Sequence, residues 1–265
     1  MTKRTVLRAV SILLFLLPAG YFGLAGAQSA YQPTVLVTGA NRGMGLEYAR
    51  QYAAMGYRVI ATARSPDRAD DLKALAAADA DVIVERLDVT DHAAIEALGA
   101  KYRQQPIDIL VNNAGVSGGA SQNTYDTIDY EDFDLAIAVN TYGPLKMATV
   151  FMPHVMASEQ KKIIAVSSNM SPIANTFGGV YVYRVSKAAL NMAYRTLAMD
   201  VRDDGVIVGL ITPPQTNTDL QPPGVDRSKL PSAKESVAGM IRNIERFTLE
   251  NSGSFYGHEG VELPW

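Results

Sequence analysis

The sequence contains no cysteine among its 265 residues, and this absence removes several kinds of chemistry. Disulfide bonds, cysteine-ligated zinc, iron–sulfur clusters and thiol nucleophiles all require cysteine. Only three histidines are present, at His92, His154 and His258, and their wide separation argues against a histidine-based metal site. We therefore expect no metal centre.

Charge is also sparse, at 19% of residues, and its net value is −3. Such a chain has no global positive field, so a nucleic-acid binder is excluded. Hydrophobic residues make up 48%, a balance typical of soluble globular domains. Disordered, collagen-like and multi-span membrane proteins have different compositions and are excluded as well.

The first 27 residues differ from the rest. Lys3, Arg4 and Arg8 precede an uncharged stretch, Ala9 to Ala27, whose last residues are the small ones Ala25-Gly26-Ala27. This order is typical of a secretory signal peptide. The uncharged stretch is nearly long enough to cross a bilayer, so an uncleaved membrane anchor is the alternative. We expect residues 1–27 to direct export and residues 28–265 to form one domain; a membrane-anchored or cytoplasmic protein is the other reading.

Beyond residue 34, short apolar runs rich in β-branched residues alternate with longer amphipathic stretches. This alternation predicts an α/β fold: a single-domain, Rossmann-type, doubly wound parallel sheet of about seven strands with helices on both faces. The expected strands are Thr34–Val37, Arg58–Ala63, Val82–Leu87, Ile107–Val111, Lys162–Val166 and Val206–Ile211. The expected helices are Met44–Met55, Asp67–Ala78, Asp91–Arg103, Asp132–Met156, Tyr181–Arg202 and Ala233–Leu249. The proline-rich stretch Pro213–Pro231 is predicted to be a lid.

A glycine cluster follows the first predicted strand. Gly39, Gly43 and Gly45 are spaced as G-x-x-x-G-x-G and lead into a helix. A strand, a glycine-rich turn and a helix in this order let backbone amides approach a pyrophosphate at the helix N-terminus. The cluster therefore predicts dinucleotide binding rather than an ordinary tight turn.

The second predicted strand indicates which dinucleotide is bound. NAD-binding enzymes usually end this strand with an acid that holds the ribose 2′-hydroxyl, and Ala63 stands at that place. Arg64 follows it and Arg42 lies in the glycine loop, so two guanidinium groups can hold a 2′-phosphate. We expect NADP(H) rather than NAD(H), unless both arginines are plain surface residues.

Tyr183 and Lys187 are four residues apart at the start of a predicted helix and so share one face. A phenol is a poor acid–base near neutral pH, but a neighbouring ammonium favours its ionised form and lowers its pKa. The pair can therefore move a proton to or from a substrate oxygen. Tyr181 has Val185 at the same spacing and lacks such a partner.

These motifs occur together with three others in one order along the chain. The others are Asn112-Asn113-Ala114-Gly115, Asn140, and Ser167-Ser168 after the fifth strand. In this order the chain resembles the short-chain dehydrogenase/reductases over about residues 34–265. The segment from Gly178 to Met192 and the ending from Ser252 to Trp265 resemble, more narrowly, the C-factor and sniffer-like carbonyl reductases.

The resemblance implies a role for each catalytic candidate. Tyr183 is the general acid in reduction and the base in oxidation, and Lys187 lowers its pKa and holds the nicotinamide ribose. Ser168 donates a hydrogen bond to the carbonyl oxygen, and Asn140 holds a water that connects Lys187 to solvent. Ser168 lies fifteen residues before Tyr183, where about thirteen is usual, so Ser167 and Ser171 remain rivals.

The resemblance also implies a set of cofactor-binding positions, most of them directly after strands. They are Gly39, Asn41, Arg42, Gly43, Met44, Gly45, Arg64, Asp88, Val89, Asn113, Ala114, Gly115, Tyr183, Lys187, Pro213, Thr216 and Thr218. Pro214 stands where the family usually has glycine, which stiffens the backbone that meets the nicotinamide.

We thus expect an NADP(H)-dependent oxidoreductase that interconverts a carbonyl and an alcohol in a small molecule. A catalytically idle NADP(H)-binding sensor or scaffold is the alternative. The family commonly pairs through its two long helices, so a homodimer or homotetramer is expected. Four aromatic residues are candidates for an apolar substrate pocket, although such residues are more often part of a core: Tyr125, Tyr142, Phe177 and Tyr181.

Overall fold

The computed structural model describes Met1 and residues 31–118, 124–221 and 224–265. Residues 32–265 form one compact unit, and the description below concerns this unit alone. Except for Met1, the expected signal peptide or anchor lies outside the described residues. Within the described part of the chain, no helix combines the length and the apolar character needed to cross a membrane.

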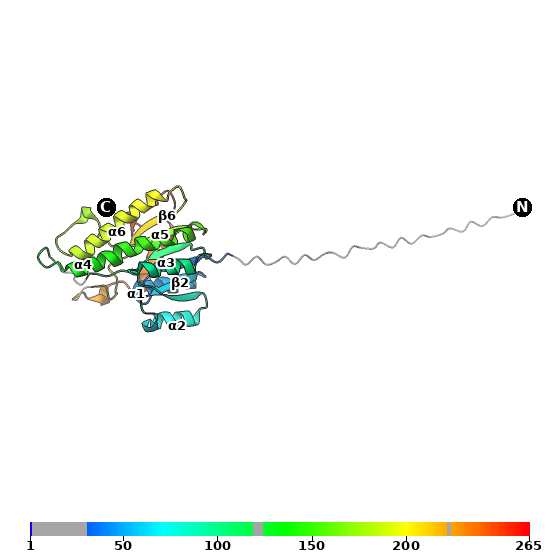
Figure 1. Ribbon diagram of the computed structural model, residues 1–265, viewed down its shortest axis with the longest axis horizontal. Helices are drawn as coiled ribbons and strands as arrows, with labels where there is room; N and C mark the ends of the chain where they lie inside the picture. The colour runs from blue at the N-terminus through cyan, green and yellow to red at the C-terminus, as the bar shows by residue number, and fades with distance from the viewer. Residues whose placement is uncertain (2–30, 119–123, 222–223) are drawn as a thin grey trace. The chain divides into compact units, whose positions relative to one another are not determined.

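Seven parallel strands form the sheet at the centre of this unit (Figure 1). The strands are β1 (Thr34–Val37), β2 (Arg58–Ala63), β3 (Val82–Arg86), β4 (Ile109–Asn112), β5 (Lys162–Val166), β6 (Ile207–Thr212) and β7 (Phe255–Gly257). Their spatial order is β3-β2-β1-β4-β5-β6-β7, so the direction of winding reverses between β1 and β4. The expected doubly wound α/β fold is confirmed, and ligands of such folds bind at this reversal.

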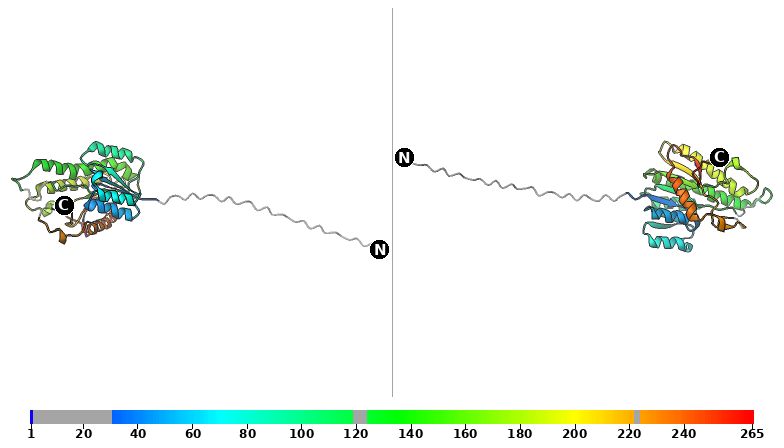
Figure 2. Two further views of the ribbon diagram at one scale, coloured as in Figure 1. Left: turned by 90° about the horizontal axis from the view of Figure 1, so that it is seen from below. Right: turned by 180° about the vertical axis from the view of Figure 1, so that it is seen from behind.

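Helices cover both faces of the sheet, and each face has its own apolar core. The helices are α1 (Gly43–Ala54), α2 (Asp70–Ala78), α3 (His92–Lys101), α4 (Tyr130–Ile137), α5 (Gly143–Met156), α6 (Tyr181–Asp200) and α7 (Ala233–Glu245). Side chains of α3, α5 and α6 pack on one face, and those of α1, α2 and α7 pack on the other. Figure 2 shows α7, in orange, beside α1, in blue, when the molecule is viewed from behind.

Two expected helices differ from the structure, and one strand had no predicted position. The predicted helix Asp132–Met156 consists of α4 and α5 joined by a π-helical turn, Ala138–Tyr142. The predicted helix from Asp67 begins as a short 3₁₀ turn, Pro66–Arg68, because Ala69 leaves the helical conformation. The expected number of about seven strands is confirmed, but the position of the seventh, β7, was not predicted, since only three residues form it.

Because all strands are parallel, their carboxyl ends lie at one edge of the sheet. The predicted motifs follow these ends: the glycine cluster follows β1, Arg64 follows β2, Asn113 follows β4 and Ser168 follows β5. The fold therefore gathers at one edge residues that are up to about 130 positions apart in the chain, from Gly39 to Ser168.

Candidate active site

The glycine loop between β1 and α1 is packed too tightly for side chains. Gly39 and Gly43 have φ values of +68° and +56°, which strongly favour glycine. A Cβ atom on Gly45 would lie 2.1 Å from the Gly39 carbonyl oxygen, and one on Gly39 would lie 2.9 Å from the Cα of Ala114. The loop is therefore shaped by backbone packed against backbone.

The N-terminus of α1 is suited to an anion. Its N-cap residue, Arg42, forms no side-chain capping hydrogen bond, and the first turn carries no acidic residue. The first amides of a helix have no partner within the helix, and the helix dipole favours negative charge there. These amides can therefore meet a phosphate.

Thr38 joins the carboxyl ends of β1 and β4. Its hydroxyl accepts hydrogen bonds from the backbone amides of Asn113, at 3.0 Å, and Ala114, at 3.1 Å. In return, Nδ2 of Asn113 donates to the carbonyl oxygen of Thr38 at 2.9 Å. These three hydrogen bonds hold the ends of β1 and β4 together at the point where the winding of the sheet reverses. Thr38 was not singled out in the sequence, although it directly precedes Gly39.

A cleft of about 1080 Å³ opens at this edge of the sheet. Thirteen of the predicted cofactor positions line it: Gly39, Asn41, Arg42, Gly43, Met44, Gly45, Arg64, Asp88, Val89, Asn113, Ala114, Gly115 and Thr218. Other lining residues were not predicted: Ser65, Arg68, Leu87, Val116, Ser117, Val139, Asn217, Asp219 and Leu220. The volume suits a large ligand such as a dinucleotide.

Three arginines stand at one end of the cleft. Arg64 and Arg68 follow β2, and Arg42 belongs to the glycine loop. Arg68 donates to the Ser65 hydroxyl at 3.1 Å. Because β2 ends in Ala63, no carboxylate occupies the end of that strand. Guanidinium groups beside a strand end that carries no acid favour a phosphate over a ribose hydroxyl.

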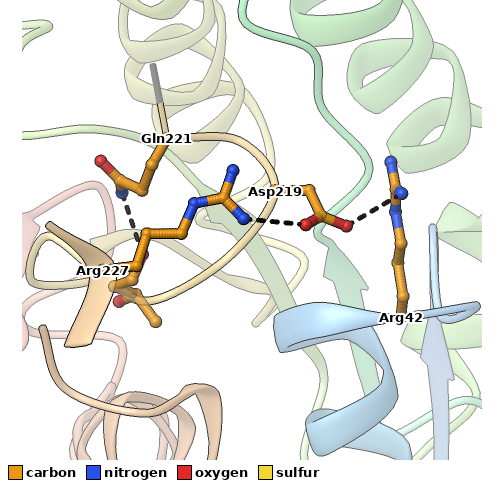
Figure 3. A network of polar contacts seen from close by, with 5 residues as sticks. Arg42, Asp219, Gln221 and Arg227 are labelled. Atoms are coloured by element: carbon orange, nitrogen blue, oxygen red, sulfur yellow. Dashed lines mark hydrogen bonds and ion pairs between the residues drawn. The ribbon is translucent and has the colours of Figure 1, made fainter. Parts of the chain in front are cut away.

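Arg42 is also tied to the proline-rich segment. Asp219 accepts a hydrogen bond from Arg42 and another from Arg227, both at 3.0 Å, so one carboxylate lies between two guanidinium groups (Figure 3). Gln221 donates to the Thr216 carbonyl oxygen at 3.0 Å within the same segment. The segment that was predicted to be a lid therefore contacts the glycine loop, with Pro222 and Pro223 outside the described residues.

Pro213 and Thr216, in the first part of this segment, do not line the cleft. The Thr216 side chain is buried; its hydroxyl donates to the Pro214 carbonyl oxygen at 2.8 Å and is hydrogen-bonded to the Ser236 hydroxyl at 2.9 Å. Asn217 donates its backbone amide to the Pro231 carbonyl oxygen at 2.9 Å, which joins the two ends of the segment.

Tyr183 and Lys187 face each other in the first turns of α6. The Lys187 ammonium lies 6.0 Å from the centre of the Tyr183 ring and donates to the Val166 carbonyl oxygen, at the end of β5, at 2.8 Å. A Cβ atom on Gly115 would lie 3.6 Å from Nζ of Lys187 and 3.2 Å from Oδ1 of Asn140. Lys187 and Asn140 therefore lie directly behind the wall of the cleft.

Burial shifts the pKa values of both groups. Burial raises the pKa of Tyr183 above its ordinary value, and a hydrogen bond with the Ser168 side chain partly offsets this rise. Burial lowers the pKa of Lys187 to about 8, because nearby protein disfavours the charged form. The structure thus differs from the expectation that Lys187 depresses the pKa of Tyr183: desolvation is the larger effect on the phenol.

The three candidate serines have different partners. The Ser167 hydroxyl donates to Oδ1 of Asn191, and the Ser171 hydroxyl donates to the Ser168 carbonyl oxygen at 2.6 Å. Asn191 also donates to the Ser171 hydroxyl at 2.8 Å. The Ser168 hydroxyl accepts from the Met170 amide at 3.1 Å, and it is the serine that interacts with Tyr183.

Asn140 lies in the π-helical turn between α4 and α5. Its side chain forms two hydrogen bonds of 2.9 Å with the backbone of Val116 and donates to the Ser186 hydroxyl at 2.9 Å. Irregular turns of this kind are frequent at functional sites. Here the turn directs Asn140 toward the end of β4 and toward α6.

The four aromatic candidates for a substrate pocket are all exposed and do not line the cleft: Tyr125, Tyr142, Phe177 and Tyr181. They do not form part of the core either.

Comparison with known proteins agrees with the fold. Residues 33–228 match the family described as short chain dehydrogenase. The chain belongs to this family, and it is an oxidoreductase of that class.

Several individual proteins are similar to the chain. The C-signal of Myxococcus xanthus is 39% identical over 161 residues, covering 60% of this chain and 93% of the relative. A 1-hydroxy-2-glutathionyl-2-methyl-3-butene dehydrogenase of Rhodococcus sp. (strain AD45) is 35% identical, covering 88% and 99%. The structure of an NADPH-bound carbonyl reductase from chicken fatty liver superposes with a TM-score of 0.80 at 32% identity, covering 89% of this chain and all of that one.

Proposed function

We propose that the protein is an NADP(H)-dependent carbonyl reductase or alcohol dehydrogenase acting on a small molecule. The observation that carries the proposal is that Tyr183 lies near both Lys187 and Ser168, and that Lys187 lies behind Gly115 in the wall of the cleft. A phenol, an ammonium and a hydroxyl in this arrangement suit proton transfer to a carbonyl oxygen.

NADPH, when bound, supplies the hydride. Tyr183 then donates the proton to the substrate oxygen, and its raised pKa keeps the phenol protonated at neutral pH. The Ser168 hydroxyl donates a hydrogen bond to the same oxygen as negative charge develops there. Lys187, mostly protonated at pH 7 because its pKa is about 8, stabilises the phenolate that remains. This arrangement favours reduction near neutral pH and oxidation at alkaline pH.

Two features support NADP(H) over NAD(H). Arg42, Arg64 and Arg68 line the end of the cleft, and Ala63 stands where an acid would contact a ribose hydroxyl. The similar structure from chicken fatty liver is described as NADPH-bound. The glycine loop and the α1 N-terminus would hold the pyrophosphate.

Mixing the purified protein with NADPH or NADH and a panel of ketones and aldehydes tests the proposal. We expect NADPH oxidation with at least one carbonyl, and a lower kcat/KM with NADH by about tenfold or more, the effect of one lost phosphate contact of about 1.4 kcal/mol. Tight NADPH binding without turnover of any carbonyl would favour an idle sensor instead.

Substitution of the serines tests the assignment within the site. Ser168→Ala should lower kcat by about 100-fold, as loss of a donor to a developing oxyanion does. Ser171→Ala serves as the matched control, because its hydroxyl is held by Asn191 and the Ser168 backbone. A larger loss in Ser171→Ala than in Ser168→Ala would reverse the assignment.

We also propose that the protein pairs with a second copy through α4, α5 and α6. Exposed apolar residues recur every seven residues on these helices: Leu135, Tyr142 and Met156 on the first stretch, with Thr149 between them, and Val185, Met192 and Met199 on α6. Such stripes suit helix–helix packing. Met192→Glu should shift the mass in sedimentation from oligomer to monomer; a monomeric wild type would contradict the pairing.

Export remains a proposal supported by the charge and apolar pattern of the first 27 residues. Mass spectrometry of the N-terminus after cell fractionation tests it. A start at Gln28 outside the cytoplasm is expected, and an intact Met1 in the cytosol would contradict it.

A further inference from the structure

Arg184 lies between Tyr183 and Lys187 in the sequence, where the motif itself requires no particular residue. Its side chain is nevertheless almost fully buried, at 9% exposure. Within the described part of the chain, no carboxylate forms an ion pair with it. A buried cation without a counter-ion is costly unless hydrogen bonds replace its lost water. The guanidinium must therefore be held by other groups.

Those groups all belong to the loop between β5 and α6. Nε of Arg184 donates to the Met170 carbonyl oxygen at 3.1 Å, and Nη1 donates to the Phe177 carbonyl oxygen. The guanidinium carbon also lies 4.2 Å from the centre of the Phe177 ring. One side chain thus holds two points of the loop that are seven residues apart, and it supports an aromatic ring that is half exposed.

The same loop contains a strained residue. Val180, directly before α6, has φ of +55° and ψ of +38°, a left-handed conformation that β-branched residues rarely adopt. Strain of this kind persists only where the surroundings enforce it. Arg184 helps to hold Val180 in this conformation in two ways. Its backbone amide donates to the Val180 carbonyl oxygen at 3.1 Å, and its side chain holds Phe177, three residues earlier in the chain.

The loop connects the two groups that must meet at the substrate oxygen. Ser168 lies at its start, two residues before Met170, and Tyr183 lies just after its end. We propose that Arg184 is a positioning residue that clamps residues 170–180 and thereby sets the Ser168 hydroxyl against Tyr183, an inference that rests on the proposed function.

Arg184→Lys tests the clamp while it keeps the charge. Lysine carries a compact point charge and cannot hold both carbonyl groups while it lies flat against Phe177. We expect amide hydrogen exchange in residues 170–180 to become about tenfold faster, because fewer contacts resist local opening. This readout requires no substrate, so it decides the clamp even if no carbonyl is turned over and the proposed function fails.

Activity provides the second readout. With the panel carbonyl that the wild type reduces fastest, kcat of Arg184→Lys should fall by about tenfold or more, while the dissociation constant of NADPH changes by less than about twofold. In a plot of kcat against pH, the fall in kcat at alkaline pH should also move to higher pH. Ser168 lowers the pKa of Tyr183, and a loosened loop weakens that hydrogen bond.

Phe247→Leu is the matched control for general destabilisation. Phe247 is buried in the core on the α1–α7 face and packs against Tyr256 at a centroid distance of 5.3 Å. This variant should lower the melting temperature without moving the alkaline fall in kcat or speeding exchange in residues 170–180. If Arg184→Lys does not fold, Phe177→Leu, which removes the ring beneath the guanidinium, should shift exchange in the same direction by a smaller factor. Unchanged exchange in residues 170–180 of Arg184→Lys would by itself overturn the proposal.

Discussion

The two sides of the cleft are stabilised in opposite ways. On the glycine-loop side, backbone approaches backbone, and the missing side chains of Gly39 and Gly45 make the contacts possible. On the catalytic side, long side chains reach across loops to carbonyl groups, as Lys187 does to Val166 and Arg184 does to Met170. Adding an atom on the glycine-loop side should therefore lower stability and weaken cofactor binding. Removing a polar group on the catalytic side should instead alter catalysis or the pH dependence.

The largest effect should come from adding one methyl group on the glycine-loop side. In Gly45→Ala, the new Cβ would collide with the Gly39 carbonyl oxygen, so the loop must move. We expect a loss of about 3 kcal/mol in the free energy of unfolding, typical of overpacking. NADPH binding should weaken by about 100-fold, measured by fluorescence titration.

The same substitution on the catalytic side is the control. A Cβ atom on Gly178 meets no atom within 4 Å, so Gly178→Ala should leave the melting temperature and NADPH binding nearly unchanged. If Gly45→Ala and Gly178→Ala changed the melting temperature and NADPH binding equally, the two sides of the cleft would not differ in how tightly their backbones are packed.

Removing the buried ammonium should raise stability while it abolishes function. The pKa of Lys187 is lowered to about 8 in the folded protein, so at pH 7 folding must desolvate a charge. Lys187→Met should therefore be more stable than the wild type at pH 7 by about 2 kcal/mol, after allowance for the hydrogen bond to Val166.

The pH dependence of this difference has a definite sign. Between about pH 8 and pH 10.5 the unfolded chain binds the lysine proton and the folded protein does not. The wild type should consequently gain stability relative to Lys187→Met as pH rises through this window, as measured by urea unfolding at each pH. A difference that stays constant from pH 7 to 10.5 would show that Lys187 is not desolvated.

A smaller effect is expected when an arginine is removed from the cleft. Arg42→Gln should weaken NADPH binding by about tenfold, as expected for one charged hydrogen bond, and change NADH binding by less than about twofold. Arg50→Gln is the control, because Arg50 belongs to α1, the helix that begins just after Arg42, but pairs with Glu47 at its surface. An equal loss for the two cofactors would mean that Arg42 does not contact the 2′-phosphate.

The smallest effect should come from Asp219, whose ion pairs are exposed. Exposed pairs contribute about 0.2–1 kcal/mol each, so Asp219→Asn should tighten NADPH binding by about two- to fivefold as it releases Arg42. The gain should vanish at high salt. Asp226→Asn, which removes an ion pair with Lys229 in the same segment, is the control and should leave NADPH binding unchanged. Weaker NADPH binding in Asp219→Asn would show that the Arg42–Asp219 contact helps to hold the cofactor.

The sequence predicted the sheet and most of the cleft because local patterns determine both. Buried parallel strands are continuous apolar runs, and parallel strands place whatever follows them at one edge. The π-helical turn around Asn140 was missed because it interrupts the helical period only briefly. The contact of Arg42 with Asp219 joins residues 177 positions apart, and no local pattern reports it.

The pKa of Tyr183 shows a different limit of prediction. The four-residue spacing from Lys187 indicates that an ammonium is near, but the sequence does not reveal how much protein surrounds the phenol. In the structure burial is the larger effect, and it raises the pKa. Arg184 likewise appeared to be a spacer, because its role depends on a loop that folds back over it.

Single-turnover kinetics of Tyr183→Phe, with NADPH and a carbonyl that the wild type reduces, test the central claim most directly. Phenylalanine keeps the ring and removes the proton donor, so the rate of reduction should fall by about 1000-fold while NADPH binding is retained. A rate equal to that of the wild type would contradict the account, because the proton would then reach the substrate oxygen by another route.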